Sequence, residues 1–192
     1  ILRKIPRIHY LMGGGRERNF IYQLHNTAIE YKSILLIEIG SSDLSESILL
    51  NMLNKNKNFK SIIYEADELT CKYLIEQKIK HKLITTNIIN KAITPDSQLY
   101  SLKKSNQSNL NRLIKLDNRD KQNKSLGFNN RLEFKEIKEL YNNEEHKIVK
   151  MDIEGTEEEL IINNQLLLSK LKNISICIEM HQQTYKKSNE FK

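Results

Sequence analysis

Continuous runs of apolar residues recur along this chain, and segments with helical periodicity separate them. The apolar runs are rich in Ile, Leu and Val and lie near residues 34–39, 61–65, 83–87, 147–152 and 174–180. Runs of this kind, without polar alternation, predict strands that are buried on both faces. The helical pattern is found near residues 43–55, 67–79 and 156–170, with a shorter segment near 134–142. Strands alternating with helices predict an α/β fold with a mostly parallel, twisted sheet and helices on both faces.

The first 32 residues precede this alternation. Apolar residues at helical spacing predict a helix over residues 16–32. The glycines at 13–15 lack the context of a phosphate-binding loop, so we interpret the stretch before the helix as a flexible linker. We therefore expect an N-terminal extension over residues 1–32 and one α/β domain over 33–192. A chain of 192 residues is long enough for one such domain and too short for two.

Four of the predicted strands end in an acidic residue. Glu38, Glu65 and Asp152 each close an apolar run, and Glu179 closes the last one, two residues before His181. In open α/β sheets, ligands bind outside the carboxyl ends of the strands. We therefore expect a single polar crevice along that edge of the sheet.

The most informative segment is IVKMDIEGTEE, residues 148–158. It predicts a buried strand that delivers Asp152 and Glu154 to a tight turn at Gly155, with a helix starting behind it. The acidic residues 157–159 favour the first turn of that helix. Carboxylates at such a strand end indicate a functional site.

Composition restricts the class of protein. Hydrophobic residues make up 39% and the mean hydropathy is −0.58, which is typical of a soluble globular domain. No run is long enough to span a membrane, and no signal segment opens the chain. Cys71 and Cys177 lie on predicted apolar faces without metal-binding spacing, so we expect two buried free thiols and a cytoplasmic protein.

The net charge of +7 raises the question of a nucleic-acid partner. Most lysines are spread along the chain, and the densest basic segment lacks aromatic residues between Tyr100 and Phe128. Its basic residues are Lys103, Lys104, Arg112, Lys115, Arg119, Lys121 and Lys124. Without aromatics for base stacking, a solvated loop or lid is favoured over a nucleic-acid groove. We expect residues 101–130 to be disordered or mobile.

The order of motifs resembles the class I S-adenosylmethionine-dependent methyltransferases, and among them the FkbM family. The resemblance covers residues 33–181 and rests on the segments IEIGSS, IIYEAD, TTNIINKAITPDSQLY, IVKMDIEGTEEELI and ICIEMH. The fourth segment is similar to the family's Lys-x-Asp-x-Glu-Gly-x-Glu motif. The resemblance implies a Rossmann-like fold and S-adenosylmethionine as the cofactor.

The resemblance also implies which residues hold the cofactor. Gly40 would let the backbone approach the ligand, and Ser41 and Ser42 with the following amides would bind the methionine carboxylate. Glu38 would help to fix the methionine amino group, often through water.

The same resemblance places Glu65 on the two ribose hydroxyls and Asn90 along the adenine edge. Asp152 would border the cofactor as well as the acceptor. The alternative for Glu65 is a charge that stabilises a helix N-terminus.

The chemistry implied is methyl transfer to a hydroxyl group, and four residues would converge near the methyl: Asp152, Glu154, Glu179 and His181. His181 has a suitable unperturbed pKa for a general base. Alternatively, Asp152 takes the proton, or joins Glu179 and His181 around a divalent metal. His181 is also open to a plain structural role as a hydrogen-bonded strand-end residue.

Two features depart from the family pattern. Leu44 occupies the position where the first motif usually has a second glycine, and little sequence follows His181, where the family continues with a helix and a β-hairpin.

A nicotinamide-dependent oxidoreductase on a similar sheet is disfavoured, because the segment GSSDLS lacks the GxGxxG of that class.

We therefore predict an O-methyltransferase acting on a sugar, a glycan or a related small molecule. The alternatives are a non-catalytic basic binding or scaffold domain of the same fold, and a nucleic-acid methyltransferase.

Overall fold

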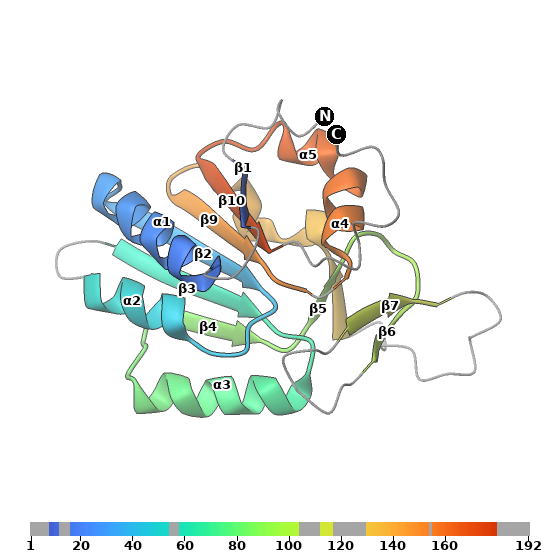
Figure 1. Ribbon diagram of the computed structural model, residues 1–192, viewed down its shortest axis with the longest axis horizontal. Coiled ribbons are helices and arrows are strands. Elements are labelled where there is room, and N and C mark those ends of the chain that lie inside the picture. Colours follow the sequence, from blue (N-terminus) through green and yellow to red (C-terminus); the bar gives the residue numbers. More distant parts are fainter. Residues whose placement is uncertain are drawn as a thin grey trace.

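A computed structural model describes residues 8–11, 16–53, 58–103, 112–116, 130–153 and 155–179 of the chain. Its central sheet contains β1 (Ile8–Leu11), β2 (Ser33–Ile39), β3 (Asn58–Tyr64), β4 (Thr86–Ile89), β9 (His146–Met151) and β10 (Ile174–Glu179). The six strands are all parallel and follow the order β1-β10-β9-β2-β3-β4 (Figure 1). Helices lie on both faces, so the predicted α/β class is confirmed, and the arrangement is compatible with a Rossmann-like fold.

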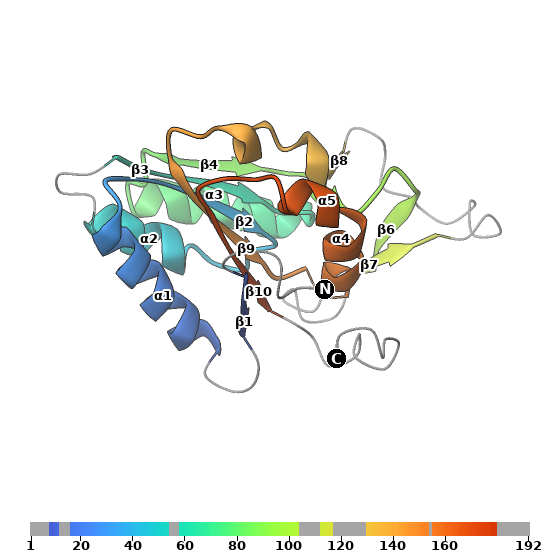
Figure 2. The same cartoon turned by 90° about the horizontal axis from the view of Figure 1, so that it is seen from above.

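Each face of the sheet has its own set of helices. One face carries α1 (Arg16–Glu30), α2 (Ser45–Leu53) and α3 (Glu68–Lys80). The opposite face carries α4 (Glu157–Asn163), α5 (Gln165–Leu168) and two short 3-10 helices, Phe134–Glu136 and Lys138–Tyr141. Figure 2 shows α1 and α2 on one side of the strands and the 3-10 helices on the other.

Strand β2 shows why the apolar runs are continuous. Leu35 and Ile37 pack in the cluster that includes the residues of α4 and the 3-10 helices. Ile34 and Leu36 pack on the other side of the sheet, against α1 and α2. Since successive side chains of a strand point to opposite faces, a strand covered on both sides needs apolar residues at every position.

Some element bounds differ from the sequence predictions. The third predicted strand, 83–87, begins only at Thr86, because residues 82–85 form a turn in which Lys82 has a positive φ of 54°. The helix predicted over 156–170 is divided at Asn164. Its side-chain amide donates to the carbonyl oxygens of Leu160 (2.8 Å) and Pro95 (3.3 Å).

The N-terminal stretch contributes to the sheet. Residues 8–11, expected to belong to a linker, form β1 and pair in parallel with β10, Ile8 opposite Ile176. A run of four residues is too short for periodicity to separate a strand from a connecting segment. The glycines at 13–15 lie outside the described residues.

Two small sheets extend the fold beyond the central one. Strand β5 (Ala92–Thr94) pairs in parallel with β8 (Arg131–Glu133), and β6 (Tyr100–Lys103) pairs antiparallel with β7 (Arg112–Lys115). The expectation that residues 101–130 lack regular structure is therefore wrong for β6 and β7. Their pairing places Tyr100 and Leu113 in a buried cluster with Ala92. So few apolar residues in a polar segment give no recognisable strand pattern in the sequence. Residues 104–111 and 117–129, with four residues of the basic cluster, lie outside the described residues.

Cys71 and Cys177 are both buried and free, as the sequence predicted. In the part of the chain that the structure describes, no helix is long and apolar enough to cross a membrane.

Candidate functional site

The carboxyl edge of the sheet brings together the ends of β2 and β9. The two strands are in register, with Glu38 opposite Lys150 and Ile39 opposite Met151, and the Asp152 amide donates to the Ile39 carbonyl at 2.9 Å. Gly40 follows with a φ of +76°. A Cβ on Gly40 would overlap the carbonyl oxygen of Asp152 and lie 3.0 Å from its carbonyl carbon. Close contact with the backbone of Asp152 therefore requires glycine at this position. The motif alone indicated a different reason, approach of the backbone to a ligand.

Glu65 connects the loops that follow β2 and β3. Its Oε2 accepts a hydrogen bond from the Ser41 amide at 3.1 Å, and its Oε1 accepts one from the Asp67 amide at 2.7 Å. Burial raises the pKa of Glu65, and the hydrogen bonds from Asp67 and Ser41 counteract part of that rise. A carboxylate oxygen can accept more than one hydrogen bond, so these contacts do not exhaust its capacity.

Asn90 joins the same edge from the end of β4. Its side-chain amide donates to the backbone carbonyls of Glu65 at 2.9 Å and Ala66 at 3.3 Å. Asn90 therefore fixes the backbone beneath Glu65. Its side chain is exposed beside the carboxyl ends of β3 and β4.

The two serines after Gly40 differ in their surroundings. Ser41 is buried, and its hydroxyl donates to the backbone carbonyl of Asp43 at 2.5 Å. Ser42 is exposed. The Asp43 side chain accepts from the amide and hydroxyl of Ser45, at 2.9 and 2.6 Å, and so shapes the entry into α2. Of the two hydroxyls, that of Ser42 is the one placed at the surface.

Leu44 occupies a core position where the family motif has glycine. It is 2% exposed and packs in a cluster with Ile63, Leu74 and Leu83. The side chain anchors the start of α2 between the sheet and α3. The loop after β2 is therefore held by burial of a large residue rather than kept open by a second glycine.

A charged cluster of two buried glutamates and a half-buried lysine lies below this loop, on the face of the sheet covered by α1 and α2. It consists of Glu38 on β2, Glu46 on α2 and Lys150 on β9. The Lys150 ammonium lies 2.7 Å from Glu46 Oε1 and 3.9 Å from Glu38 Oε1, and Glu38 is completely buried. Burial raises the pKa of Glu38 well above its usual range, Glu46 adds to the rise, and Lys150 opposes it.

Sequence reasoning identified Glu38 but missed Glu46 and Lys150. The register of the two strands would have identified Lys150. Lys150 lies two residues before Asp152, and Glu38 lies two residues before Gly40. Since β2 and β9 are parallel neighbours, Glu38 and Lys150 are opposite one another and point to the same face of the sheet.

The predicted catalytic residues are described only in part. Asp152 is half-buried directly after β9, and Glu179 ends β10. These residues follow a pair in register, Met151 and Ile178, so the topology brings their backbones to neighbouring positions. Glu154, His181 and the side chain of Glu179 lie outside the described residues. Their convergence near a methyl group stays a prediction.

A metal site was left open by the sequence. Within the described residues, no group of three or more His, Cys, Asp or Glu side chains is suited to hold a metal ion. The set considered from the sequence includes His181 and Glu179, whose side chains are not among those described.

Comparisons of this chain with protein-family models, with curated proteins and with solved structures found no match. The function is therefore argued from the motifs and from the geometry of this edge.

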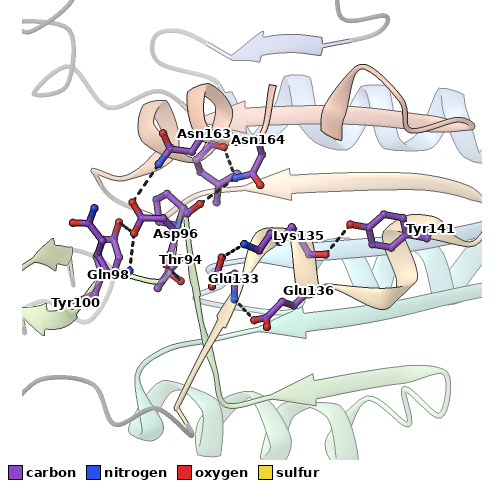
Figure 3. A network of polar contacts seen from close by, with 12 residues as sticks. Thr94, Asp96, Gln98, Tyr100, Glu133, Lys135, Glu136, Tyr141, Asn163 and Asn164 are labelled. Atoms are coloured by element: carbon purple, nitrogen blue, oxygen red, sulfur yellow. Dashed lines mark hydrogen bonds and ion pairs between the residues drawn. The ribbon is translucent and has the colours of Figure 1, made fainter. Parts of the chain in front are cut away.

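A second polar network, which sequence reasoning missed, lies beside the carboxyl edge and is centred on Asp96 (Figure 3). Its Oδ1 accepts from the Gln98 amide at 2.9 Å and from the Tyr100 hydroxyl at 3.1 Å. Its Oδ2 lies 3.4 Å from the side-chain nitrogen of Asn163 on α4 and 3.5 Å from the Lys115 ammonium on β7. The network fastens the segment between β5 and β6 to α4 and to the small antiparallel sheet.

Proposed function

We propose that this chain binds S-adenosylmethionine at the carboxyl edge of β2, β3 and β4 and transfers its methyl group to a hydroxyl of a sugar, a glycan or a related small molecule. The observation that carries the proposal is the position of Glu65. Its carboxylate ends β3 and contacts the Ser41 amide, directly after Gly40 at the end of the neighbouring strand. The two motifs that the family uses for the cofactor therefore face one another.

The residues of this edge fit the cofactor. Each Glu65 oxygen accepts a backbone amide bond, and the carboxylate keeps capacity for ribose hydroxyls. The exposed Asn90 borders the adenine side, and Gly40, Ser41 and Ser42 border the methionine side. Both oxygens of Glu38 are buried without a hydrogen bond from any described residue, and a water or an ammonium group near the loop would supply one.

The parallel strand order and the helices on both faces support a class I methyltransferase fold. When bound, the cofactor supplies an electrophilic methyl group for in-line displacement, so much of the task of the protein is orientation. The contact between Gly40 and Asp152 fixes the end of β9 beside the cofactor loop. In this proposal Asp152 orients an acceptor hydroxyl or takes its proton, His181 is the other candidate base, and Glu154 and Glu179 are near them in the sequence motifs.

Calorimetric titration of S-adenosylmethionine and S-adenosylhomocysteine tests the proposal. We expect micromolar binding to the unaltered chain and about tenfold to hundredfold weaker binding to Glu65→Gln, since hydrogen bonds to a charged group each contribute about 1.5–3 kcal/mol. Glu68→Gln is the matched control, because Glu68 lies three residues away and is exposed. Absence of binding by the folded, unaltered chain would contradict the proposal.

The acceptor is tested by transfer of a radiolabelled methyl group to a panel of sugars and glycans. Cofactor binding without transfer to any hydroxyl compound would favour the non-catalytic alternative. Transfer to RNA or DNA would favour the nucleic-acid alternative.

A further inference from the structure

The Glu38–Glu46–Lys150 cluster connects the three elements that surround the loop after β2. Glu38 precedes Gly40 by two residues, Glu46 lies in the first turn of α2, and Lys150 precedes Asp152 by two residues. The Lys150 ammonium lies 2.7 Å from the Glu46 carboxylate, and Lys150 is opposite Glu38 in the register of β9 with β2. The cluster therefore ties both ends of the loop to β9, and β9 in turn holds Asp152 against Gly40.

The hydrogen-bonding capacity of the cluster indicates its protonation state. If both glutamates were ionised, one ammonium would face two carboxylates at a buried position. Both oxygens of Glu38 and Oε2 of Glu46 would then lack a hydrogen bond from any described residue. A single proton on Glu38 balances the charge and is shared with Glu46 through a hydrogen bond that Glu38 donates. The Lys150 ammonium lies 3.9 Å from Glu38 and 2.7 Å from Glu46, so the two carboxyls flank the same cation. Burial is the main cause that raises the pKa of Glu38, and the charge of Glu46 is the second.

Other ionisable groups face the cluster from the packed elements. Asp43, at the entry to α2, adds negative charge near Glu38, and Asp152 acts on Lys150 from the end of β9. Cys177 on β10 is the register neighbour of Lys150, and burial raises the pKa of its thiol to about 12. Among the described residues, then, Lys150 is the cation that balances the cluster. Asp43 favours retention of the shared proton, and Asp152 favours the charged form of Lys150.

We propose that Glu46 and Lys150 are positioning residues, which together with Glu38 form a one-proton cluster that holds the loop of residues 40–44 against the end of β9. The part of this inference that concerns the cofactor rests on the proposed function. The part that concerns the loop rests on the cluster alone. Loss of the shared proton as pH rises leaves a surplus negative charge, and the loop loosens.

Glu46→Gln imitates the protonated cluster. Its carbonyl oxygen can accept from Lys150 while its amide donates to Glu38, so charge balance no longer requires a proton. Lys150→Met removes the cation and leaves two carboxyls, and the double variant Lys150→Met/Glu46→Gln restores neutrality with a protonated Glu38. Lys147→Met is the matched control, because Lys147 lies on the same strand, is at least as buried as Lys150, and points to the opposite face of the sheet.

Hydrogen exchange of the amides at residues 41–44, without cofactor and corrected for intrinsic rates, provides the first measurement. We expect protection in the unaltered chain to fall as pH rises from about 4.3 toward the raised pKa of Glu38, by at most about tenfold for each pH unit, and to level off above that pKa. Protection in Glu46→Gln should stay constant over the same range. Lys150→Met should lose protection at neutral pH, the double variant should regain it, and Lys147→Met should match the unaltered chain.

Titration of S-adenosylhomocysteine into the same variants provides the second measurement, with weaker binding by Lys150→Met and recovery in the double variant. If the unaltered chain binds no cofactor, the proposed function fails, and loop exchange still decides the role of the cluster. Equal loop protection in Lys150→Met and Lys147→Met would overturn the inference, whatever the titration shows.

Discussion

Gly40 and the backbone carbonyl of Asp152 lie so close together that no side chain fits between them. A Cβ on Gly40 would overlap the carbonyl oxygen of Asp152 and lie 3.2 Å from Cγ2 of Ile153. The relationship joins the first and the fourth sequence motif, which are more than a hundred residues apart. The position of the loop after β2 and the position of Asp152 are therefore set together.

We expect Gly40→Ala to destabilise the protein by about 2–4 kcal/mol, because it combines overpacking with a positive φ. Gly155→Ala is the control for backbone strain: Gly155 has a φ of +111°, but a Cβ there meets no atom of the described residues within 4 Å. Urea denaturation of both variants separates the two contributions. Equal losses of stability would show that the Asp152 contact does not restrict residue 40.

Leu44→Gly introduces the second glycine of the motif that this chain resembles, and we expect it to lower the stability of the protein. The side chain is 2% exposed in the cluster with Ile63 and Leu74, so its removal should cost about 3–5 kcal/mol from the cavity and the added backbone freedom. Leu69→Ala is the control, because Leu69 on α3 is 68% exposed, and we expect it to change stability by less than about 0.5 kcal/mol. A Leu44→Gly variant as stable as the unaltered chain would show that the loop adapts.

Glu65 has a structural role that can be measured separately from any ligand. Glu65→Ala leaves the amides of Ser41 and Asp67 without their carboxylate acceptor, so we expect a loss of about 1–3 kcal/mol in the free energy of unfolding. Glu68→Ala should change it by less than about 0.5 kcal/mol, since its ion pair with Lys72 is exposed. Thermal or urea unfolding without cofactor checks both values. A Glu65→Ala variant as stable as the unaltered chain would mean that the loops after β2 and β3 do not depend on these two hydrogen bonds.

The sequence predicted the parts of this fold that repeat a strong local signal. Runs such as residues 34–39 fill both faces of a buried strand, so their position was predictable to within a few residues. The acids at the strand ends were recognisable for the same reason, and Glu65 and Asn90 do lie at neighbouring strand ends. The acidic residues meet at one edge of the sheet because parallel strands all end on the same side.

What the sequence did not predict depends on contacts between distant segments. Lys150 and Glu46 are 104 residues apart, and only the register of β2 with β9 and the packing of α2 bring them together. Asp96 is similar: its partners Asn163 and Lys115 belong to other elements, and a single polar residue in a loop carries no periodicity. Strand β1 was missed because four residues give too little pattern.

Thiol reactivity tests the burial of the two cysteines. Burial raises the pKa of the Cys177 thiol to about 12, and it also raises that of Cys71, with Glu65 and Glu68 adding to the effect. A buried thiol with a raised pKa presents little thiolate, so we expect an aromatic disulfide reagent to modify both residues only as fast as the protein opens. Reaction in denaturant should be immediate for two thiols per chain. Rapid modification of the native protein, assigned with Cys71→Ser and Cys177→Ser, would contradict this burial.

The raised pKa of Glu38 predicts a pH dependence of stability. Burial raises the pKa in the folded protein, with Glu46 adding to the rise and Lys150 opposing it, whereas the unfolded chain ionises near the usual value of about 4.3. Between these two values the folded protein holds a proton that the unfolded chain has lost. This contribution to stability is therefore fully present below the unfolded pKa and is lost as pH rises toward the folded pKa, by at most about 1.4 kcal/mol per pH unit.

Glu38→Gln removes this proton while its amide can still donate to Glu46. We therefore expect the stability of Glu38→Gln relative to the unaltered chain to increase as pH rises from about 4.3, and to level off above the folded pKa. Urea denaturation over a pH series measures the difference, in which the contributions of unchanged groups cancel. Glu68→Gln should show no such trend, because Glu68 is exposed. Parallel stability curves for Glu38→Gln and the unaltered chain would mean that Glu38 is ionised in the folded protein, and the charge of the cluster would then have to be balanced without a shared proton.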